Sequence, residues 1–336
     1  MQVQQNYPLK KYNTFGINAI AKYFSTFSSF DELKNLIEEK NVSSKMILGG
    51  GSNILFTKNY EGLVLKNEIP GIDIIKEEND FVFIKAGAGV SWHSFVIFCV
   101  ANNFGGVENL SLIPGNIGAS PMQNIGAYGV EVKDVFYELE ALHLQEKTIR
   151  KFYVEDCEFG YRESVFKKKY KGLFVILNVT YRLKKNPVFN ISYGAIEKEL
   201  VKMKIGKLSI KAISDAVINI RTSKLPNPSI IGNAGSFFKN PVVEQEEIVK
   251  LELQEIEIPF YKTEDGYYKI PGGWLIEQCG WKGYRKGDAG CYDKQALVLV
   301  NYGNATGADI YNLSEEIKIS VKEKFDIELE REVNIL

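Results

Sequence analysis

The feature that most constrains the fold is the segment 113–129, in which small and polar residues replace the apolar periodicity of helices and strands. A stretch of this length without secondary structure is usually functional or disordered. Its apolar residues, among them Ile117 and Ile125, argue against disorder. It is also the third glycine-rich segment of the chain, after residues 49–51 and 87–89. We therefore expect an ordered loop that works together with other glycine turns.

The first glycine turn follows a short apolar strand, residues 46–48, and could surround a phosphate with backbone N–H groups. It is not the GxGxxG fingerprint of dinucleotide-binding proteins, because Ile54 stands where the third glycine is needed. The second glycine turn fails for the same reason, since Trp92 occupies its third glycine position. The chain also has no GxxxxGK[ST] phosphate loop. One glycine turn alone is most simply a tight turn, but two glycine-rich walls suit a diphosphate carried between two lobes.

Composition excludes several classes of protein. The 336 residues, 45% hydrophobic and 25% charged, predict a globular chain of two or three domains. A net charge of -1 favours neither nucleic acid nor membrane as a partner. The four cysteines form no CxxC pair and no apolar run reaches about 18 residues, so we expect a cytoplasmic protein without membrane insertion, disulfides or a metal site. His93 and His143, the only histidines, are expected to be structural, so acid–base chemistry must come from other groups.

Local patterns predict several elements. Ser29 and Glu32 have capping-box spacing before a helix, and helices are expected over residues 92–100 and 209–222. Strands are expected over 135–144 and 173–181. Two prolines after residue 225 indicate a domain boundary nearby. In the tail, alternation predicts a strand with one face formed by Glu328, Glu330 and Glu332.

Six segments together resemble the UDP-N-acetylenolpyruvoylglucosamine reductase family. They are residues 13–16 (NTFG), 48–55, 113–129, 159–167 (FGYRESVFK), 232–241 (GNAGSFFKNP) and 295–301, in the order that the family has. The segment 192–194 (SYG) further resembles the subclass with an additional substrate-covering loop.

The resemblance implies an α+β fold, with a two-lobed FAD-binding module of the vanillyl-alcohol-oxidase type and a C-terminal α+β substrate domain. The first lobe would span residues 1–68, and the second lobe 69–214 with the substrate-covering loop near Tyr193. The substrate domain would span 215–336, and its tail would return to the active site.

The implied activity belongs to peptidoglycan precursor synthesis. NADPH would reduce the bound FAD, and hydride would then pass to the methylene carbon of UDP-N-acetylglucosamine enolpyruvate, giving UDP-N-acetylmuramate. We expect a monomer that binds these small molecules and no nucleic acid.

The resemblance assigns three catalytic residues. Arg162 would stabilise the developing charge, which suits its permanent charge and planar fork; Ser236 would protonate the adjacent carbon, and Glu332 would be the active-site glutamate. Without the resemblance, the neighbouring residues favour simpler interpretations. Arg162 would be a surface arginine, Ser236 a turn residue and Glu332 part of a solvated strand edge. Glu330 stays a rival of Glu332, because Arg331 stands where proline is commoner.

The resemblance also assigns binding residues. Lys224 would hold an ammonium near a diphosphate, because a helix end and a proline-locked turn fix its place. Tyr292 stands where a histidine is frequent, which leaves the nucleotide contacts there open. The substrate set is Tyr161, Arg162, Tyr193, Lys224, Asn240 and Gln295. The FAD set is Gly49, Gly50, Gly51, Ser52, Asn53, Pro114, Gly115, Ile117, Gly118, Ala119, Gln123, Asn124, Ala127, Tyr128 and Gly129.

Two alternatives remain. A related flavin oxidase would often tether its flavin through histidine or cysteine, and residues 49–53 and 113–129 contain neither. A non-catalytic flavin or UDP-sugar sensor would not need Arg162, Ser236 and Glu332 together.

Overall fold

The computed structural model describes residues 2–38, 44–253, 257–263 and 265–336. The chain divides into two compact units. Unit 1 comprises residues 1–7, 21–51 and 60–223, and unit 2 comprises residues 8–20, 52–59 and 224–336. Two short N-terminal segments thus belong to the unit built by the C-terminal third of the chain. The expected boundary at 214/215 falls inside helix α4 (Ile210–Lys224), and the three-domain division stays a prediction.

Two larger sheets form most of the described part of unit 1. In the first, of order β1-β2-β5-β3, strands β2 and β3 both run parallel to β5. Helix α1 (Phe30–Ile37) follows β2 and packs Leu33 and Leu36 into a core with Leu63 and Leu65 of β5. The strands are β1 (Gln4–Pro8), β2 (Ile20–Phe27), β3 (Lys45–Leu48) and β5 (Tyr60–Asn67).

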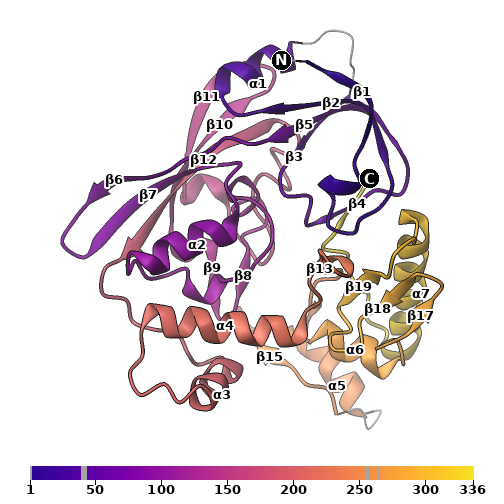
Figure 1. Ribbon diagram of the computed structural model, residues 1–336. Coiled ribbons are helices and arrows are strands. Elements are labelled where there is room, and N and C mark those ends of the chain that lie inside the picture. The colour runs from indigo at the N-terminus through magenta and orange to yellow at the C-terminus, as the bar shows by residue number, and fades with distance from the viewer. Residues whose placement is uncertain (1, 39–43, 254–256, 264) are drawn as a thin grey trace. The chain divides into compact units, whose positions relative to one another are not determined.

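The second sheet of unit 1 is antiparallel, of order β11-β10-β12-β7-β6. Helix α2 (Trp92–Ala101) is labelled near this sheet in Figure 1, and its residues Trp92, Phe95 and Cys99 belong to the same core as the sheet. The strands are β6 (Ile72–Glu77), β7 (Phe81–Gly87), β10 (Phe136–His143), β11 (Ile149–Tyr153) and β12 (Phe174–Lys184). The expected helix over 92–100 and the strands over 135–144 and 173–181 are therefore confirmed.

The segment 113–129 is ordered and anchored to this sheet. The Ser120 and Tyr181 hydroxyls are 2.7 Å apart, and both residues are buried. Tyr181 in turn packs edge-on against Trp92, whose indole N–H donates to the Leu110 carbonyl at 2.9 Å. The segment itself contains a 3-10 turn η3 (Ile117–Ala119) and strand β8 (Gly126–Ala127), which pairs with β9 (Val130–Glu131). Its long irregular path is thus fixed by buried aromatic residues.

The rest of unit 1 is a pair of helices, α3 (Gly194–Lys202) and α4 (Ile210–Lys224). Their shared core includes Ile196, Ile213 and Val217. The helix expected over 209–222 is confirmed as α4, whereas the sequence interpretation contained no helix at α3.

Unit 2 is built on a four-stranded sheet of order β13-β19-β18-β17. Its strands are β13 (Gly232–Ser236), β17 (Arg285–Lys286), β18 (Ala289–Cys291) and β19 (Val298–Asn301). A smaller sheet contains β14 (Val242–Val243), β15 (Tyr261–Lys262) and β16 (Tyr268–Lys269). The helices are α5 (Gln245–Leu253), α6 (Gly272–Gln278) and α7 (Gly307–Phe325).

The C-terminal tail is not the continuous strand that alternation predicts. Its only regular strand is β20 (Asn334–Ile335), which pairs in parallel with β4 (Ile54–Leu55). The alternation itself is present, because Ile327 and Leu329 are buried while Glu328 and Glu330 are exposed. The tail has only an isolated bridge, Phe238 with Arg331, before β20, so alternate burial arises here without a ladder of backbone hydrogen bonds.

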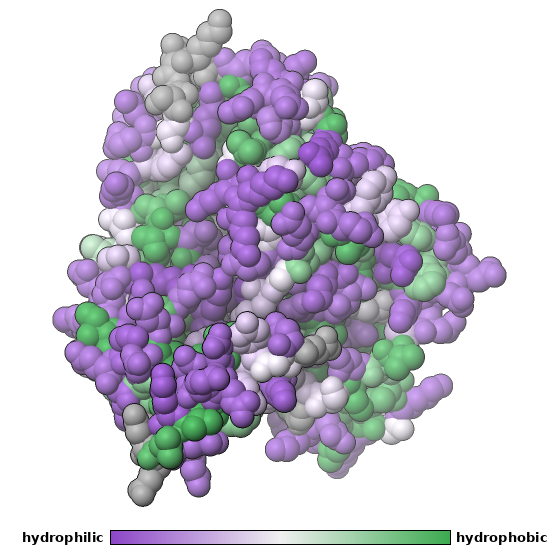
Figure 2. Space-filling view, turned by 180° about the vertical axis from the view of Figure 1, so that it is seen from behind, coloured by the Kyte–Doolittle hydropathy of each residue, from purple (hydrophilic) through white to green (hydrophobic). Residues whose placement is uncertain are grey.

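Figure 2 shows a face on which hydrophobic residues form small groups among hydrophilic ones. Within the described part of the chain, no helix is long and apolar enough to cross a membrane.

Candidate active site

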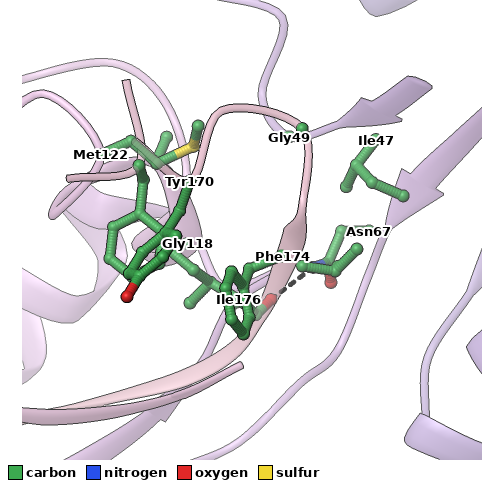
Figure 3. Close-up of a pocket in the computed structure, with 13 residues that line it drawn as sticks. Ile47, Gly49, Asn67, Gly118, Met122, Tyr170, Phe174 and Ile176 are labelled. Carbon is green, nitrogen blue, oxygen red and sulfur yellow. Dashed lines mark hydrogen bonds between the residues drawn. The ribbon is translucent and has the colours of Figure 1, made fainter. Parts of the chain in front are cut away.

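A cavity of about 120 Å³ lies in unit 1 (Figure 3). Gly49, directly after β3, lines one part of it, and Gly118 and Ala119 of the segment 113–129 line another. Phe174 and Ile176 of β12 complete the apolar part of the wall. Two of the predicted glycine-rich walls therefore meet at one cavity, which has room for only part of a dinucleotide.

The two walls approach each other so closely that side chains would not fit. A Cβ added to Gly50 would lie 2.8 Å from the Cα of Gly115 and 2.8 Å from the side-chain oxygen of Asn116. A Cβ on Gly118 would lie 2.8 Å from the Cβ of Ala88. Such contact needs glycine, which also lets a ligand reach the backbone. The arrangement fits a diphosphate-bearing cofactor bound through backbone groups.

Some residues of the expected FAD set support the loop through their side chains. Ile117 is fully buried in the core of the second sheet. The Asn124 amide donates to Glu131 and to the Gly160 carbonyl, and its oxygen accepts from the Lys133 N–H. Ser52 and Asn53 belong to unit 2. The cofactor contacts of all these residues stay predictions.

Arg162 lies in a tight turn of unit 1 with a left-handed backbone, φ 56°. The turn is closed by reciprocal backbone hydrogen bonds between Gly160 and Glu163. The guanidinium donates to the Gly126 carbonyl at 2.6 Å and lies over the Tyr161 ring at 5.6 Å. A non-glycine residue in this conformation costs about 1 kcal/mol or more, and such strain concentrates at functional sites. The turn thus holds the Arg162 guanidinium in a defined place in unit 1.

Arg221 of α4 is a second cation near Arg162, and the sequence analysis missed it. Its Nε–H donates to the Leu112 carbonyl at 3.3 Å, and its guanidinium lies near the Tyr128 hydroxyl. Burial lowers the pKa of Arg221, and the charge of Arg162 adds to this. No ion pair of Arg221 occurs among the described residues. Its position four residues after Val217, on the buried side of α4, was the signal that could have revealed it.

Tyr128 connects this cation pair to the expected substrate-covering loop. Its ring centre lies 5.5 Å from that of Tyr193, at an interplanar angle of 86°. Behind the rings, the buried amide of Asn109 donates to the carbonyls of both Tyr128 and Asn190. Tyr193 itself is 48% exposed. Unit 1 therefore brings Arg162, Arg221, Tyr128 and Tyr193 together.

Unit 2 brings Ser236 and Glu332 together. Ser236 ends β13, where the register with β19 shifts and Gly235 has a φ of 70°. The Glu332 N–H donates to the carbonyl of Phe237, the next residue after Ser236, at 2.9 Å. Glu330, the rival, is 69% exposed in its side chain and forms an ion pair of 2.6 Å with the buried Lys239. Glu330 thus already has a charge partner. The backbone of Glu332 pairs with Phe237, next to Ser236, whereas the backbone of Glu330 pairs with Lys239.

The remaining expected substrate residues also belong to unit 2. Asn240 accepts from the Gly272 N–H at 2.9 Å, and a Cβ on Gly273 would lie 2.8 Å from the Gln295 side-chain oxygen. Asn240 and Gln295 therefore lie at the same Gly272–Gly273 pair. Lys224 is exposed at the end of α4. The substrate contacts of these three residues stay predictions.

The histidines have the structural surroundings that the sequence predicts. His93 Nδ1 accepts from the Leu112 N–H at 3.0 Å, and burial lowers its pKa. His143 Nδ1 accepts from the Glu146 N–H, and its ring packs edge-on against Phe174.

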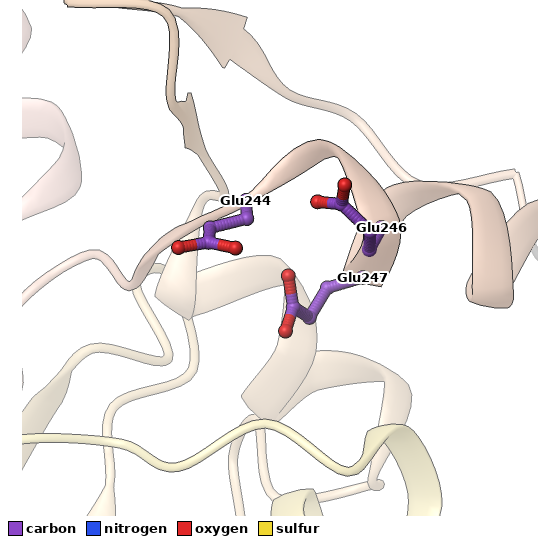
Figure 4. A group of neighbouring side chains, drawn as sticks. All are labelled: Glu244, Glu246 and Glu247. Atoms are coloured by element: carbon purple, nitrogen blue, oxygen red, sulfur yellow. The ribbon is translucent and has the colours of Figure 1, made fainter.

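Three glutamates gather at the start of α5, with carboxylate oxygens within 4.8 Å of one another (Figure 4). They are Glu244, Glu246 and Glu247. Acidic residues at a helix N-terminus are stabilised by the helix dipole, which accounts for the group.

The fold and the glycine-lined cavity define an FAD-binding oxidoreductase. Residues 23–150 match the model of an FAD binding domain. Residues 227–336 match the model of the UDP-N-acetylenolpyruvoylglucosamine reductase C-terminal domain. The reductase of that name from Amoebophilus asiaticus is 51% identical over the full length of both chains, and that from Flavobacterium johnsoniae is 49% identical over the same extent. The chain therefore belongs to the UDP-N-acetylenolpyruvoylglucosamine reductase family.

Solved structures agree on the fold. The reductase from Thermus caldophilus superposes with a TM-score of 0.71 at 23% identity, covering 100% of this chain and 99% of that one. A solvent-stable cholesterol oxidase superposes with a TM-score of 0.51 at 11% identity, covering 98% of this chain and 86% of that one. The expected α+β fold, with an FAD-binding module of the vanillyl-alcohol-oxidase type and a C-terminal α+β domain, is confirmed.

Proposed function

We propose that this chain reduces UDP-N-acetylglucosamine enolpyruvate to UDP-N-acetylmuramate, with NADPH as reductant, in cytoplasmic synthesis of peptidoglycan precursors. Relatives with the same reductase name match it over its full length. The observation that carries the proposal is Arg162, a cation presented by a strained turn in the same unit as the glycine-lined cavity.

Bound FAD supplies the hydride chemistry, accepting hydride from NADPH and delivering it to the substrate. The residues that would hold it are the glycines of both walls, Gly49 to Gly51, Gly115 and Gly118, through backbone groups. The closeness of these walls leaves no room for larger side chains, which supports binding through the backbone.

The protein must stabilise negative charge and supply one proton. Hydride addition to the methylene carbon pushes an electron pair toward the substrate carboxylate, and the Arg162 fork would stabilise this charge through paired hydrogen bonds. Arg221 would add a second positive charge to the same region. The two arginines would bring the anionic substrate into place before charge develops.

Ser236 would donate its hydroxyl proton to the carbon beside the carboxylate, which completes the reduction of the double bond. Support comes from its half-buried position at the end of β13 and from the C-terminal tail, where Glu332 would orient the hydroxyl. The Nδ1 atoms of both histidines accept backbone hydrogen bonds, as expected of residues with a structural role.

The visible spectrum of the purified protein tests the proposal. We expect a yellow protein with one non-covalent FAD that heat or acid releases. NADPH should bleach it, and the UDP-enolpyruvyl sugar should restore the colour without oxygen. Restoration by oxygen alone would favour the oxidase alternative, and failure to take up FAD would refute the proposal.

Ser236→Ala separates the two half-reactions. NADPH should still bleach the variant, because no proton from Ser236 is needed there. Reoxidation by the UDP-sugar should fall about 100- to 10,000-fold, the usual contribution of a proton-transfer group. Anaerobic stopped-flow absorbance measures both steps. Equal loss in both would mean that Ser236 shapes the flavin site instead.

A further inference from the structure

The C-terminal strap, residues 327–336, is held to unit 2 by a few backbone bonds. The Lys239 N–H donates to the Glu330 carbonyl and the Glu332 N–H donates to the Phe237 carbonyl, both at 2.9 Å. The Asn53 amide donates to the Glu332 carbonyl at 3.2 Å. Between these bonds lies a single residue, Arg331. The strap is also held by the β20–β4 pairing and by the buried Leu329 and Val333, and Arg331 is a further point of attachment directly beside Glu332.

The Arg331 side chain reaches α7 and makes three contacts there. Its Nε–H donates to the Ser314 hydroxyl at 2.9 Å, its guanidinium lies 4.6 Å from the Tyr311 ring centre, and it forms an ion pair with Glu315. These three residues are spaced i, i+3 and i+4 on one face of the helix. The Arg331 side chain is only 15% exposed, and its hydrogen bond lowers the pKa of Glu315. The contacts form one clamp between strap and helix.

The backbone of Arg331 contributes nothing comparable. The two bonds that flank it use the groups of Glu330 and Glu332, as in a non-hydrogen-bonded antiparallel pair. No hydrogen bond in the described part of the chain uses the Arg331 N–H. The side chain alone thus ties residue 331 to the fold, and a residue without an N–H could replace it.

We propose that Arg331 is a positioning residue for Glu332, because its clamp on α7 restricts the strap that carries the glutamate. The proposal rests on the function proposed above. It also implies that proline, which stiffens the backbone and needs no N–H, substitutes for the clamp at this position.

Four variants test the clamp. In Arg331→Gln and Glu315→Gln, we expect faster amide exchange at Glu332 and Asn334, and flavin reoxidation by the UDP-sugar slower by about 10- to 100-fold, as for a small displacement of a reacting group. Reduction by NADPH should be unchanged. In Arg331→Pro, amide exchange and flavin reoxidation should both return to within about threefold of wild type, because proline stiffens the backbone at a position where no N–H is needed. Lys286→Gln, which breaks the ion pair of Lys286 with Glu316 on the same helix, is the matched control and should change neither.

Hydrogen exchange followed by mass spectrometry needs no substrate, so it separates this proposal from the proposed function. Unchanged exchange and reoxidation in Arg331→Gln would overturn the clamp, even if the melting temperature fell. A proline variant that folds but stays as slow as Arg331→Gln would overturn it as well. Faster exchange in Arg331→Gln, with Glu332→Gln as active as wild type, would keep the clamp and refute the role of Glu332.

Discussion

Two arginines lie in the same part of unit 1, although like charges in a partly buried site repel each other. Both guanidinium groups donate to backbone carbonyls, which satisfy hydrogen bonds but carry no full negative charge. The Tyr128 hydroxyl is the side-chain partner of Arg221, and burial raises the pKa of that tyrosine. An anionic ligand bound near Arg221 would therefore lower the cost of burying its charge.

Arg221→Met should weaken binding of the UDP-enolpyruvyl sugar by about 10- to 100-fold, because a hydrogen bond to a charged group contributes about 1.5–3 kcal/mol. Arg221→Lys should recover only part of this, since an ammonium lacks the planar fork. Perturbation of the flavin spectrum during titration measures the dissociation constant. Arg182→Met, which removes an exposed arginine stacked on Phe81, is the control. Equal affinities of the Arg221 and Arg182 variants would contradict a role in binding.

The two tail glutamates differ in their surroundings, and their variants should differ too. Glu332→Gln should slow reoxidation by the sugar by about 100-fold or more, because charge development is sensitive to a preorganised group. Glu330→Gln removes a charge partner of the buried Lys239, which should lower stability and leave reoxidation near the wild-type rate. Stopped-flow traces of both variants decide between them. A defect confined to Glu330→Gln would show that the tail assignment is displaced by two residues.

At the scale of elements, helix starts follow their local signals to different degrees. Thr306 and Asp309 form a complete capping box at α7, with reciprocal hydrogen bonds of 3.1 and 2.8 Å. At α1, Ser29 accepts from the Glu32 N–H, but the Glu32 carboxylate bonds Ser28 instead of Ser29. The spacing therefore predicted the start of α1 correctly. The expected bond from the Ser29 N–H to the Glu32 carboxylate is replaced by bonds from Ser28, because this neighbouring serine competes for the carboxylate.

The 3-10 turn η2 (Glu108–Leu110) contains a buried carboxyl group. Glu108 is 3% exposed, and burial raises its pKa, although its carboxylate accepts from the Gly106 N–H at 2.6 Å. The folded state therefore binds this proton more tightly than the unfolded state, so the associated stability is present at low pH and is lost as pH rises through the raised pKa.

Glu108→Gln should remove this pH dependence while keeping an acceptor for Gly106. We expect its melting temperature to exceed that of the wild type at pH 7.5, and the difference to shrink toward pH 4.5, where the wild-type carboxyl is protonated. Glu61→Gln, at an exposed site, is the control. Differential scanning calorimetry across pH would contradict the interpretation if the gain grew as pH fell.

At the scale of the whole molecule, cofactor binding should couple to stability. The glycine walls belong to two segments of unit 1 that are far apart in the chain, so FAD would link them in the folded state only. A ligand at about 100 times its dissociation constant adds about 2.7 kcal/mol.

We expect added FAD to raise the melting temperature of the apoprotein in proportion to the logarithm of its concentration. Gly50→Ala should retain less FAD, because its Cβ would meet the backbone of Gly115 at 2.8 Å. Gly206→Ala, where a Cβ would meet nothing within 4 Å, is the matched control. Identical flavin content in the two variants would show that the walls move apart without loss of the site.

Local sequence patterns were sufficient to predict the elements with strong periodicity and the glycine turns, because these depend on neighbouring residues. Helices α1, α2 and α4 and strands β10 and β12 follow from such patterns, and so does the loop 113–129. The family resemblance added the two-lobed FAD-binding fold, which the comparisons confirm.

Contacts between residues far apart in the chain became known only from the folded structure. It assigned segments 8–20 and 52–59 to unit 2, paired Lys239 with Glu330 and carried Arg331 to α7. It also placed Arg221 beside Tyr128, a contact between α4 and the loop 113–129. Local periodicity carries no information on such contacts. They depend on how whole elements pack and on which charged side chains the packing brings close together.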